Sequence, residues 1–136
     1  MNDDVRSALR LAPNASGGQR TIDITTYGAR SGRPRRIEIW FHYIDGRWYL
    51  TGSPGRRDWY ANVRADPRLI FHLKRGVRAD LPATARPVTD PDERRSVFEP
   101  ILAWLRSINP SSPQSYRMED WLAGSPLAEI TFDEPV

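Results

Sequence analysis

The chain has 136 residues, of which 39% are hydrophobic and 27% are charged, and this composition is typical of one globular domain rather than a disordered chain. It contains no cysteine, which excludes disulfides, thiolate metal sites and a cysteine nucleophile. The net charge is only +3, and Lys74 is the sole lysine, so arginine carries nearly all of the positive charge. Because the guanidinium group suits phosphate and carboxylate ligands, the positions of the arginines bear directly on function.

The same features bear on cellular location. A chain without cysteine is typical of a reducing compartment. The unbroken apolar runs are far shorter than a membrane span, and residues 1–4 are acidic where a secretory signal would be basic and then apolar. We therefore expect a cytoplasmic protein with no membrane-spanning segment.

The first residues differ in pattern from the rest of the chain. Residues 4–12 are compatible with a short helix, and residues 13–18, which read PNASGG, are typical of a turn or linker. Strand periodicity begins at Thr21, where Ile22 and Ile24 alternate with polar residues until Gly28. We therefore expect an N-terminal helix and linker over residues 1–20, followed by one domain over residues 21–136.

The clearest element is a β-hairpin. Residues 36–44 alternate between two faces, and Asp45-Gly46 then provides the residue pair that a type I′ turn prefers. Residues 47–52 form the returning strand. Further strands are expected over residues 69–74, 77–88 and 127–132.

Helical patterns lie between these strands. Asp58 is a plausible N-cap for a helix that ends at residue 65, before Asp66-Pro67. Asp90-Pro91 begins a longer helix, which Pro100 should kink or divide, and residues 116–122 are also compatible with a helix. Strands outnumber helices, so the predicted class is α+β, built on a small antiparallel sheet or barrel.

Two loops carry the residues that favour an anionic ligand. Four of the seven residues over 30–36 are arginine, and residues 53–57 combine Ser53 and Gly55 with two further arginines directly before a helix start. Helix N-termini and guanidinium groups both attract anions. The hairpin should bring both loops to the same end of its two strands, although a simple solvated charge run is the alternative for either loop.

The sequence offers few groups for acid–base or metal chemistry. His42 and His72 are the only histidines, and each lies within a strand and away from a carboxylate cluster, so we expect no metal site and no Ser-His-Asp arrangement. An enzyme of this composition would depend on a bound organic cofactor. Trp40, Trp48 and Trp59 adjoin the loops, and each is either a core residue or a platform for a planar ring.

Residues 25–35 read TTYGARSGRPR, and Asp45-Gly46, the SPG of residues 53–55 and the WYANVRADP of residues 59–67 follow in order. Together these motifs resemble the deazaflavin-dependent nitroreductase and quinone reductase family, a branch of the flavin-binding split β-barrel superfamily. The resemblance covers residues 21–74 and extends more loosely to residue 105. It implies an antiparallel split β-barrel with short flanking helices that binds coenzyme F-420.

The resemblance also implies which residues bind the cofactor. By position, Arg30, Ser31 and Arg35 would hold its phosphate and acidic tail. Ile39 and Thr51 would meet the ring mainly through their backbones. Ser53 and Gly55 would line the phosphate end, while Trp59 and Asn62 would close the site from the helix. The chain departs from the family pattern in that Ala29 and Pro54 replace basic residues and Glu38 replaces a common proline.

We therefore predict an oxidoreductase that transfers a hydride from reduced F-420 to a quinone, a nitroaromatic or another conjugated acceptor. No catalytic side chain is assigned. The alternatives are a split barrel that binds FMN or haem, with or without turnover, and a basic module that binds nucleic acid, which the low net charge disfavours. Proteins of this superfamily are often homodimers, so a homodimer is one expected assembly.

Overall fold

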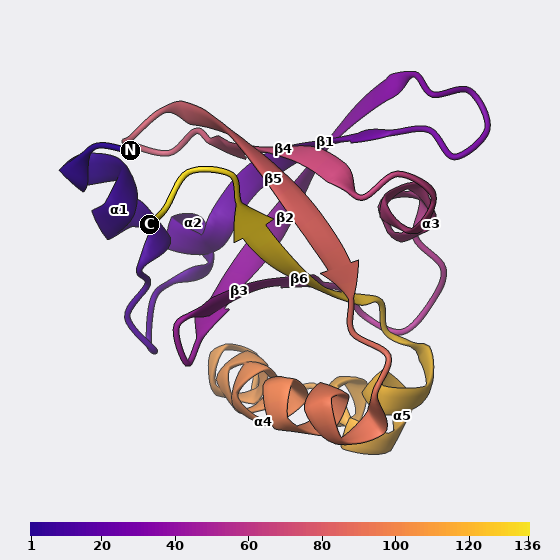
Figure 1. Ribbon diagram of the computed structural model, residues 1–136. Helices are drawn as coiled ribbons and strands as arrows, with labels where there is room; N and C mark the ends of the chain where they lie inside the picture. The colour runs from indigo at the N-terminus through magenta and orange to yellow at the C-terminus, as the bar shows by residue number, and fades with distance from the viewer.

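The computed structural model describes residues 1–136 and contains a closed antiparallel barrel with the strand order β1-β2-β3-β6-β5-β4 (Figure 1). The six strands are β1 (Thr21–Tyr27), β2 (Pro34–Ile44), β3 (Arg47–Thr51), β4 (Arg68–Leu73), β5 (Ala79–Pro87) and β6 (Leu127–Phe132). This confirms the predicted α+β class with an antiparallel barrel.

Strand β2 has different neighbours along its length. Its residues 34–40 pair with β1, whereas pairing with β3 is confined to residues 41–44. Asp45 and Gly46 have φ values of 51° and 77°, which confirms the type I′ hairpin that joins β2 to β3. From Trp48 to Thr51, β3 pairs with β6 on its other edge, so the barrel closes while the first half of β2 lacks a second neighbour.

Helices surround the barrel at both ends and on one side (Figure 1). They are α1 (Asp3–Leu9), α2 (Gly17–Arg20), α3 (Asp58–Ala65), α4 (Pro91–Ile108), a 3-10 turn over Pro113–Tyr116, and α5 (Met118–Gly124). Helices α1 and α3 lie at opposite ends of the barrel, and α4 and α5 pack together outside it. None of the helices combines the length and the hydropathy that crossing a membrane requires.

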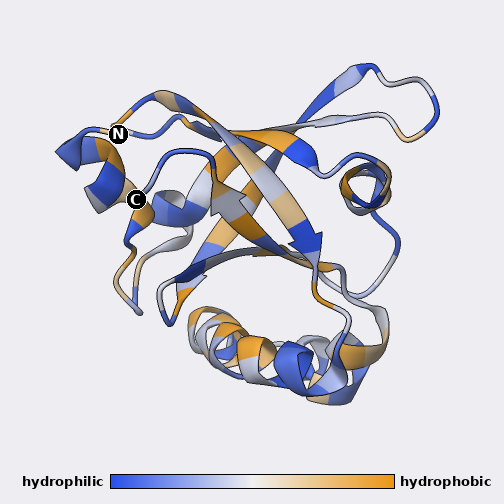
Figure 2. Ribbon diagram, in the orientation of Figure 1, coloured by the Kyte–Doolittle hydropathy of each residue, from blue (hydrophilic) through white to orange (hydrophobic).

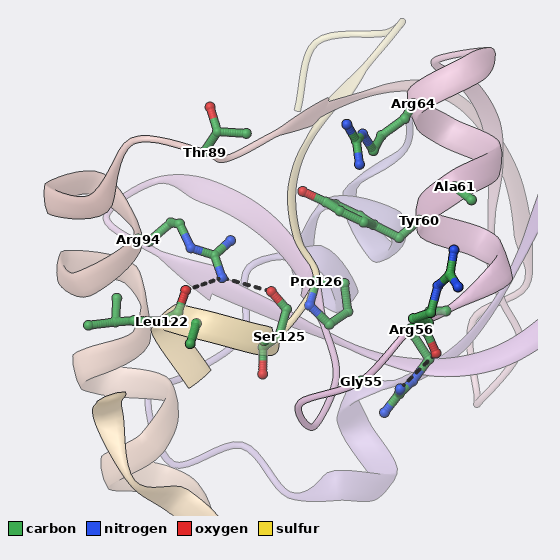
Figure 3. Close-up of a pocket in the computed structure, with 13 residues that line it drawn as sticks. Gly55, Arg56, Tyr60, Ala61, Arg64, Thr89, Arg94, Leu122, Ser125 and Pro126 are labelled. Carbon is green, nitrogen blue, oxygen red and sulfur yellow. Dashed lines mark hydrogen bonds between the residues drawn. The ribbon is translucent and has the colours of Figure 1, made fainter. Parts of the chain in front are cut away.

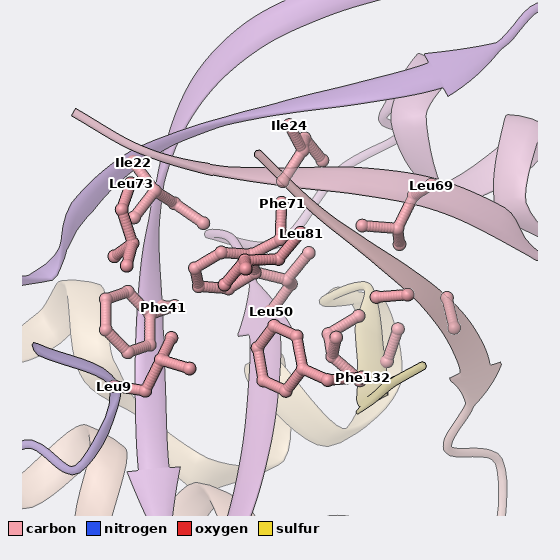
Figure 4. Close-up of a cluster of buried hydrophobic side chains, with 14 of the residues drawn as sticks. Leu9, Ile22, Ile24, Phe41, Leu50, Leu69, Phe71, Leu73, Leu81 and Phe132 are labelled. Atoms are coloured by element: carbon pink, nitrogen blue, oxygen red, sulfur yellow. The ribbon is translucent and has the colours of Figure 1, made fainter. Parts of the chain in front are cut away.

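The barrel interior is a continuous hydrophobic core (Figure 4). The rings of Phe41, Phe71 and Phe132 follow one another edge to face, with centroids 5.1 and 5.0 Å apart. Figure 2 shows that hydrophobic residues alternate with polar ones along the strands, as expected where one face of each strand is buried. A second cluster, which includes Phe98 and Trp121, joins α4 and α5 to the outside of the barrel.

Three local expectations differ from the structure. Helix α2 was expected to be linker, but Ser16 and Gln19 form a reciprocal capping box at its start. Asp58 is the first residue of α3 rather than its N-cap, which is Arg57 without a side-chain cap bond. Pro100 does not divide α4, which continues through it as one helix; Pro100 lies at an exposed position, where water can satisfy the carbonyl that loses its N–H partner.

The N-terminal segment contributes to the barrel core. Val5 and Leu9 of α1 belong to the same buried cluster as the strand residues, and Leu9 is fully buried. The Trp48 indole N–H donates a hydrogen bond of 2.9 Å to the Leu9 carbonyl. Segment 1–20 therefore packs on the barrel, and its division from residues 21–136 as a separate unit stays a prediction.

Leu9→Ala should lower the free energy of unfolding by about 3 kcal/mol, because it leaves a cavity at a fully buried position. Chemical denaturation of the whole chain measures this change. Ser7→Ala, at an exposed position of the same helix, is the control and should change stability little. Equal stability of the two variants would show that α1 is not part of the core.

A buried arginine and a buried histidine meet between α2, β2 and α4. Arg20 hydrogen-bonds to the Nδ1 atom of His42 at 3.0 Å, and its guanidinium lies 3.8 Å from the Trp104 ring centroid. Burial, together with the charge of Arg20, lowers the pKa of His42 from 6.5 to about 3. Since Arg20 can only donate, the Nδ1 atom of His42 accepts, and His42 is neutral in the folded protein.

This neutral histidine predicts a loss of stability in acid. The unfolded chain takes up a proton at His42 below pH 6.5 whereas the folded chain does not, so stability falls as the pH falls through this range. Between pH 7 and pH 5 the contribution of His42 is about 2 kcal/mol. Denaturation of wild type and His42→Gln at both pH values measures it, and an equal pH dependence in the two proteins would contradict the assignment.

Candidate functional site

The first half of β2 presents an open strand edge. Gly28 donates a backbone hydrogen bond to the Arg33 carbonyl. Hydrogen-bonded pairs alternate along an antiparallel ladder, so in the register of β1 and β2 the odd-numbered residues of β2 direct their backbone N–H and C=O groups toward β1. The backbone N–H and C=O groups of Arg36 and Glu38 therefore point away from β1. No strand lies on that side, because the β2–β3 ladder stops at Phe41. These groups are available to water or to a ligand.

The turn between β1 and β2, together with the adjoining ends of both strands, forms an arm that projects from the barrel (Figure 1). Gly32 donates to the Gly28 carbonyl at 2.8 Å and has a φ of 68°, a conformation that favours glycine. The Ser31 hydroxyl accepts a hydrogen bond from the Arg33 N–H at 3.1 Å. Gly28 leaves room for this hydroxyl, since a Cβ there would lie 2.6 Å from it.

Asn62 of α3 fixes the arm to the barrel. Its Oδ1 accepts from the Ala29 N–H at 3.0 Å, and its Nδ2 donates to Thr26 Oγ1 at 3.1 Å. Asn62 is only 6% exposed, so both bonds lie in surroundings where lost partners are costly. The side chain therefore ties the arm to α3.

A groove of about 610 Å³ lies between the arm and α3. It brings together five of the predicted site residues: Arg30, Ser31, Arg35, Trp59 and Asn62. Arg30 and Arg35 are exposed, and neither forms an ion pair. The arginines that do pair with carboxylates are Arg6, Arg36, Arg47, Arg68 and Arg86. The groove thus contains two guanidinium groups that are free to bind an anion.

The groove also contains residues that were not predicted. Ile37 shares a face with Arg35 and with the buried Ile24, yet it is 38% exposed because no strand covers β2 there. Asp58 places an exposed carboxylate beside it. Alternation in the sequence predicts that Ile37 faces the core. Its exposure follows from the lack of a strand beside this part of β2, which the sequence pattern does not show.

The tryptophans have mainly structural roles. Trp59 is buried within the core cluster and also lines the groove. Trp48 packs on Tyr43 and Phe132 inside the barrel, and Trp40 lies outside it, with its ring 5.3 Å from that of Trp104. Only Trp59 therefore adjoins the groove.

The remaining predicted residues lie elsewhere. Ile39 is half-buried against the core, and Thr51 is buried with its hydroxyl donating to the Pro126 carbonyl. Ser53 lines a separate pocket beside α5, and Gly55 lines a third cavity between α3 and α5. The loop of residues 53–57 turns toward α5, because the Gly55 N–H donates to the Gly124 carbonyl at 3.0 Å. The two arginine-bearing loops thus flank α3 but line different cavities.

Glu38 points away from the groove. Its carboxylate pairs with Lys74 on the outer face of the sheet, where Asp23 also contacts the Lys74 ammonium at 2.6 Å. The hydrogen bonds that the Lys74 ammonium donates to the carboxylates of Asp23 and Glu38 raise the pKa of Lys74. Glu38 therefore brings its backbone to the open edge but not its carboxylate.

Asn62→Ala should destabilise the protein by about 1–3 kcal/mol, because it leaves the Ala29 N–H and the Thr26 hydroxyl without their partner. The arm amides should exchange with solvent faster, which hydrogen exchange measures. Arg64→Ala, at an exposed position of the same helix, is the control. Unchanged exchange over residues 28–33 would show that Asn62 does not hold the arm.

Comparison with known proteins agrees with this architecture. A family model described as F420H(2)-dependent quinone reductase matches residues 10–116. Among solved structures, a putative pyridoxamine 5'-phosphate oxidase from Listeria innocua is similar at 12% identity, with a TM-score of 0.66 and coverage of 97% of this chain and 93% of that one.

Two further solved structures are described as reductases, and both descriptions name F420. One, an F420 reductase, is 14% identical with a TM-score of 0.66, and the match covers 98% of this chain and 97% of that one. The other, an F420-H2 dependent reductase, is 20% identical with a TM-score of 0.57, and the match covers 82% of this chain and 94% of that one. These likenesses confirm the split-barrel fold.

Proposed function

Because the chain belongs to the F420H(2)-dependent quinone reductase family, we propose that the groove between the arm and α3 binds reduced coenzyme F-420 and that a quinone accepts its hydride. Family membership confirms the predicted F-420-dependent oxidoreductase and its cofactor. The observation that supports the groove as the site is the combination of two unpaired guanidinium groups with an open strand edge.

The residues of the groove suit the chemistry of this cofactor, which is a planar ring on a polyanionic tail. Arg30 and Arg35 would bind the phosphate and the acidic groups of the tail, since forked guanidinium donors match such oxyanions. Exposed Ile37 would contact the apolar surface of the ring. The free backbone groups of Arg36 and Glu38 would hydrogen-bond to polar ring atoms.

The bound cofactor supplies the hydride, and the chain supplies binding and electrostatic stabilisation. N–H groups of the open edge and nearby arginines would stabilise negative charge where it develops on carbonyl oxygens. The one acidic side chain of the groove, Asp58, is exposed, so solvent would protonate the reduced acceptor. Nitroaromatics and other conjugated compounds are further proposed acceptors.

The proposed roles of the other predicted residues rest on their positions near the groove. Ile39 and Thr51 lie where β2 and β3 separate, which supports backbone contacts with one edge of the ring. Ser53 and Gly55 lie in the loop that leads into α3, whose start adjoins the groove, and this supports a contribution to the phosphate end. Ser31 would contribute its hydroxyl, and Trp59 and Asn62 would close the groove from α3.

Substitution of the two free arginines tests the groove. Arg30→Gln and Arg35→Gln should each weaken F-420 binding by about 10- to 100-fold, because each removes a charged hydrogen bond of about 1.5–3 kcal/mol. Fluorescence titration measures the change. Arg33→Gln is the matched control, since Arg33 lies in the same turn but outside the groove.

A parallel titration with FMN separates the alternatives. We expect wild type to prefer F-420, whereas tighter binding of FMN would favour a flavin protein and haem absorbance in the purified protein would favour a haem binder. If Arg30→Gln, Arg35→Gln and the control Arg33→Gln bound F-420 with equal affinity, the groove would not be the cofactor site. Salt-sensitive binding of oligonucleotides would instead favour a nucleic-acid module.

A homodimer remains a proposal for this chain. A solved neighbour described as a domain-swapped dimer, 17% identical with a TM-score of 0.57, supports it.

A further inference from the structure

The cavity between α3 and α5 that Gly55 lines has a volume of about 620 Å³ and also borders the segment before α4 (Figure 3). Its lining includes four arginines: Arg56, Arg57, Arg64 and Arg94. None of its 13 lining residues is acidic, and none of the four arginines forms an ion pair. The cavity is therefore strongly cationic. Ala61 of α3 lines both this cavity and the groove, so the two sites are neighbours on either side of one helix.

Arg94 brings a buried charge to the cavity. It is 9% exposed, and its guanidinium donates to backbone carbonyls, including those of Val88 at 2.9 Å and Ser125 at 2.7 Å. These bonds join α4 to the end of α5 (Figure 3), but carbonyl dipoles do not neutralise a full charge. Burial lowers the pKa of Arg94, which shows how poorly its charge is solvated. An anion in the cavity would supply the missing counter-charge.

Ser125 provides an independent indication of a ligand. The residue lines the cavity and is only 5% exposed, and its hydroxyl oxygen is the one buried side-chain polar atom of the chain without a hydrogen-bond partner. Buried polar groups without a partner are rare and costly in native proteins. A bound oxyanion would accept the hydrogen bond that this hydroxyl leaves unmade.

The outer rim of the cavity carries two exposed cations. Arg56 and Arg64 are exposed, and their guanidinium groups donate no hydrogen bond within the chain. Arg64 lies over the Tyr60 ring at 5.9 Å. Arg57 is instead held in place, because it donates to the carbonyls of Ser53 and Arg56. The rim therefore offers two exposed cations, whereas Arg94 is buried and hydrogen-bonded.

We propose that this cavity is a second anion site, which binds a ligand with at least two phosphate or carboxylate groups. Arg94 and Ser125 would hold one group at the base, and Arg56 and Arg64 would hold another at the rim. Two sources share this chemistry: a free small polyanion, and the acidic tail of a cofactor that lies in the neighbouring groove. Only the second source rests on the proposed function.

Calorimetric titration with inorganic pyrophosphate tests the site without any cofactor. The double variant Arg56→Gln/Arg64→Gln should bind at least about tenfold more weakly than wild type, because it removes two charged donors. Arg78→Gln/Arg95→Gln is the matched control, since it removes the same charge at exposed positions outside the cavity. Pyrophosphate binding should survive Arg30→Gln/Arg35→Gln, which alters only the groove.

Ser125→Ala should have opposite effects on stability and on pyrophosphate binding. It removes an unsatisfied hydroxyl, so the melting temperature without pyrophosphate should stay equal or rise, while pyrophosphate affinity should fall by about threefold or more. The proposal is overturned if wild type shows no saturable binding. It is also overturned if both double variants lose affinity equally.

The source of the anion follows from F-420 titrations with and without saturating pyrophosphate. If pyrophosphate weakens F-420 binding to wild type but not to Arg56→Gln/Arg64→Gln, the anion is the acidic tail of the cofactor. Unchanged F-420 binding supports a separate polyanion. If F-420 does not bind at all, the proposed function fails, yet the pyrophosphate result still decides the anion site.

Discussion

The separation of β2 from β3 is the feature on which the rest of the site depends. Backbone N–H and C=O groups must find partners, and a barrel satisfies them by pairing every strand on both edges. In this chain β3 has five residues and β2 has eleven, so the β2–β3 ladder stops at Phe41, and Arg36 and Glu38 keep free backbone groups on one side. The same separation exposes Ile37 and leaves the groove open beside α3.

The groove is organised before a ligand arrives. Asn62 ties the turn at Ala29 to α3, and the internal bonds of the Gly28–Gly32 turn fix its shape. A ligand therefore meets a strand edge that is already in place beside α3, and only the exposed side chains of Arg30 and Arg35 must be ordered on binding. Preorganisation of this kind lowers the entropic cost of association.

Sequence patterns predicted the elements well because most of them are local. The Asp45-Gly46 turn, the alternation of β1 and β2, and the Asp90-Pro91 helix start each depend on neighbouring residues. The two arginine-bearing loops were expected to converge, since a hairpin fixes where its strands end. The two loops run in different directions because β3 pairs with β6, a long-range contact that local sequence patterns do not predict. The sequence likewise predicts that Gly17 belongs to a linker, whereas its missing side chain leaves space for the Trp40 ring. Arg20 and Arg94 are buried, although hydrophobic periodicity predicts no charged residue in a buried position.

An unpaired strand edge also carries a hazard, because it can recruit the edge of another chain and begin aggregation. On this edge the exposed side chains include Arg35, Arg36 and Glu38, and natural sheets use charges of this kind to discourage such contacts. The arginine-rich start of β2 would thus have a second use: in the absence of ligand, its charges should discourage other chains from pairing with the backbone groups that the groove exposes.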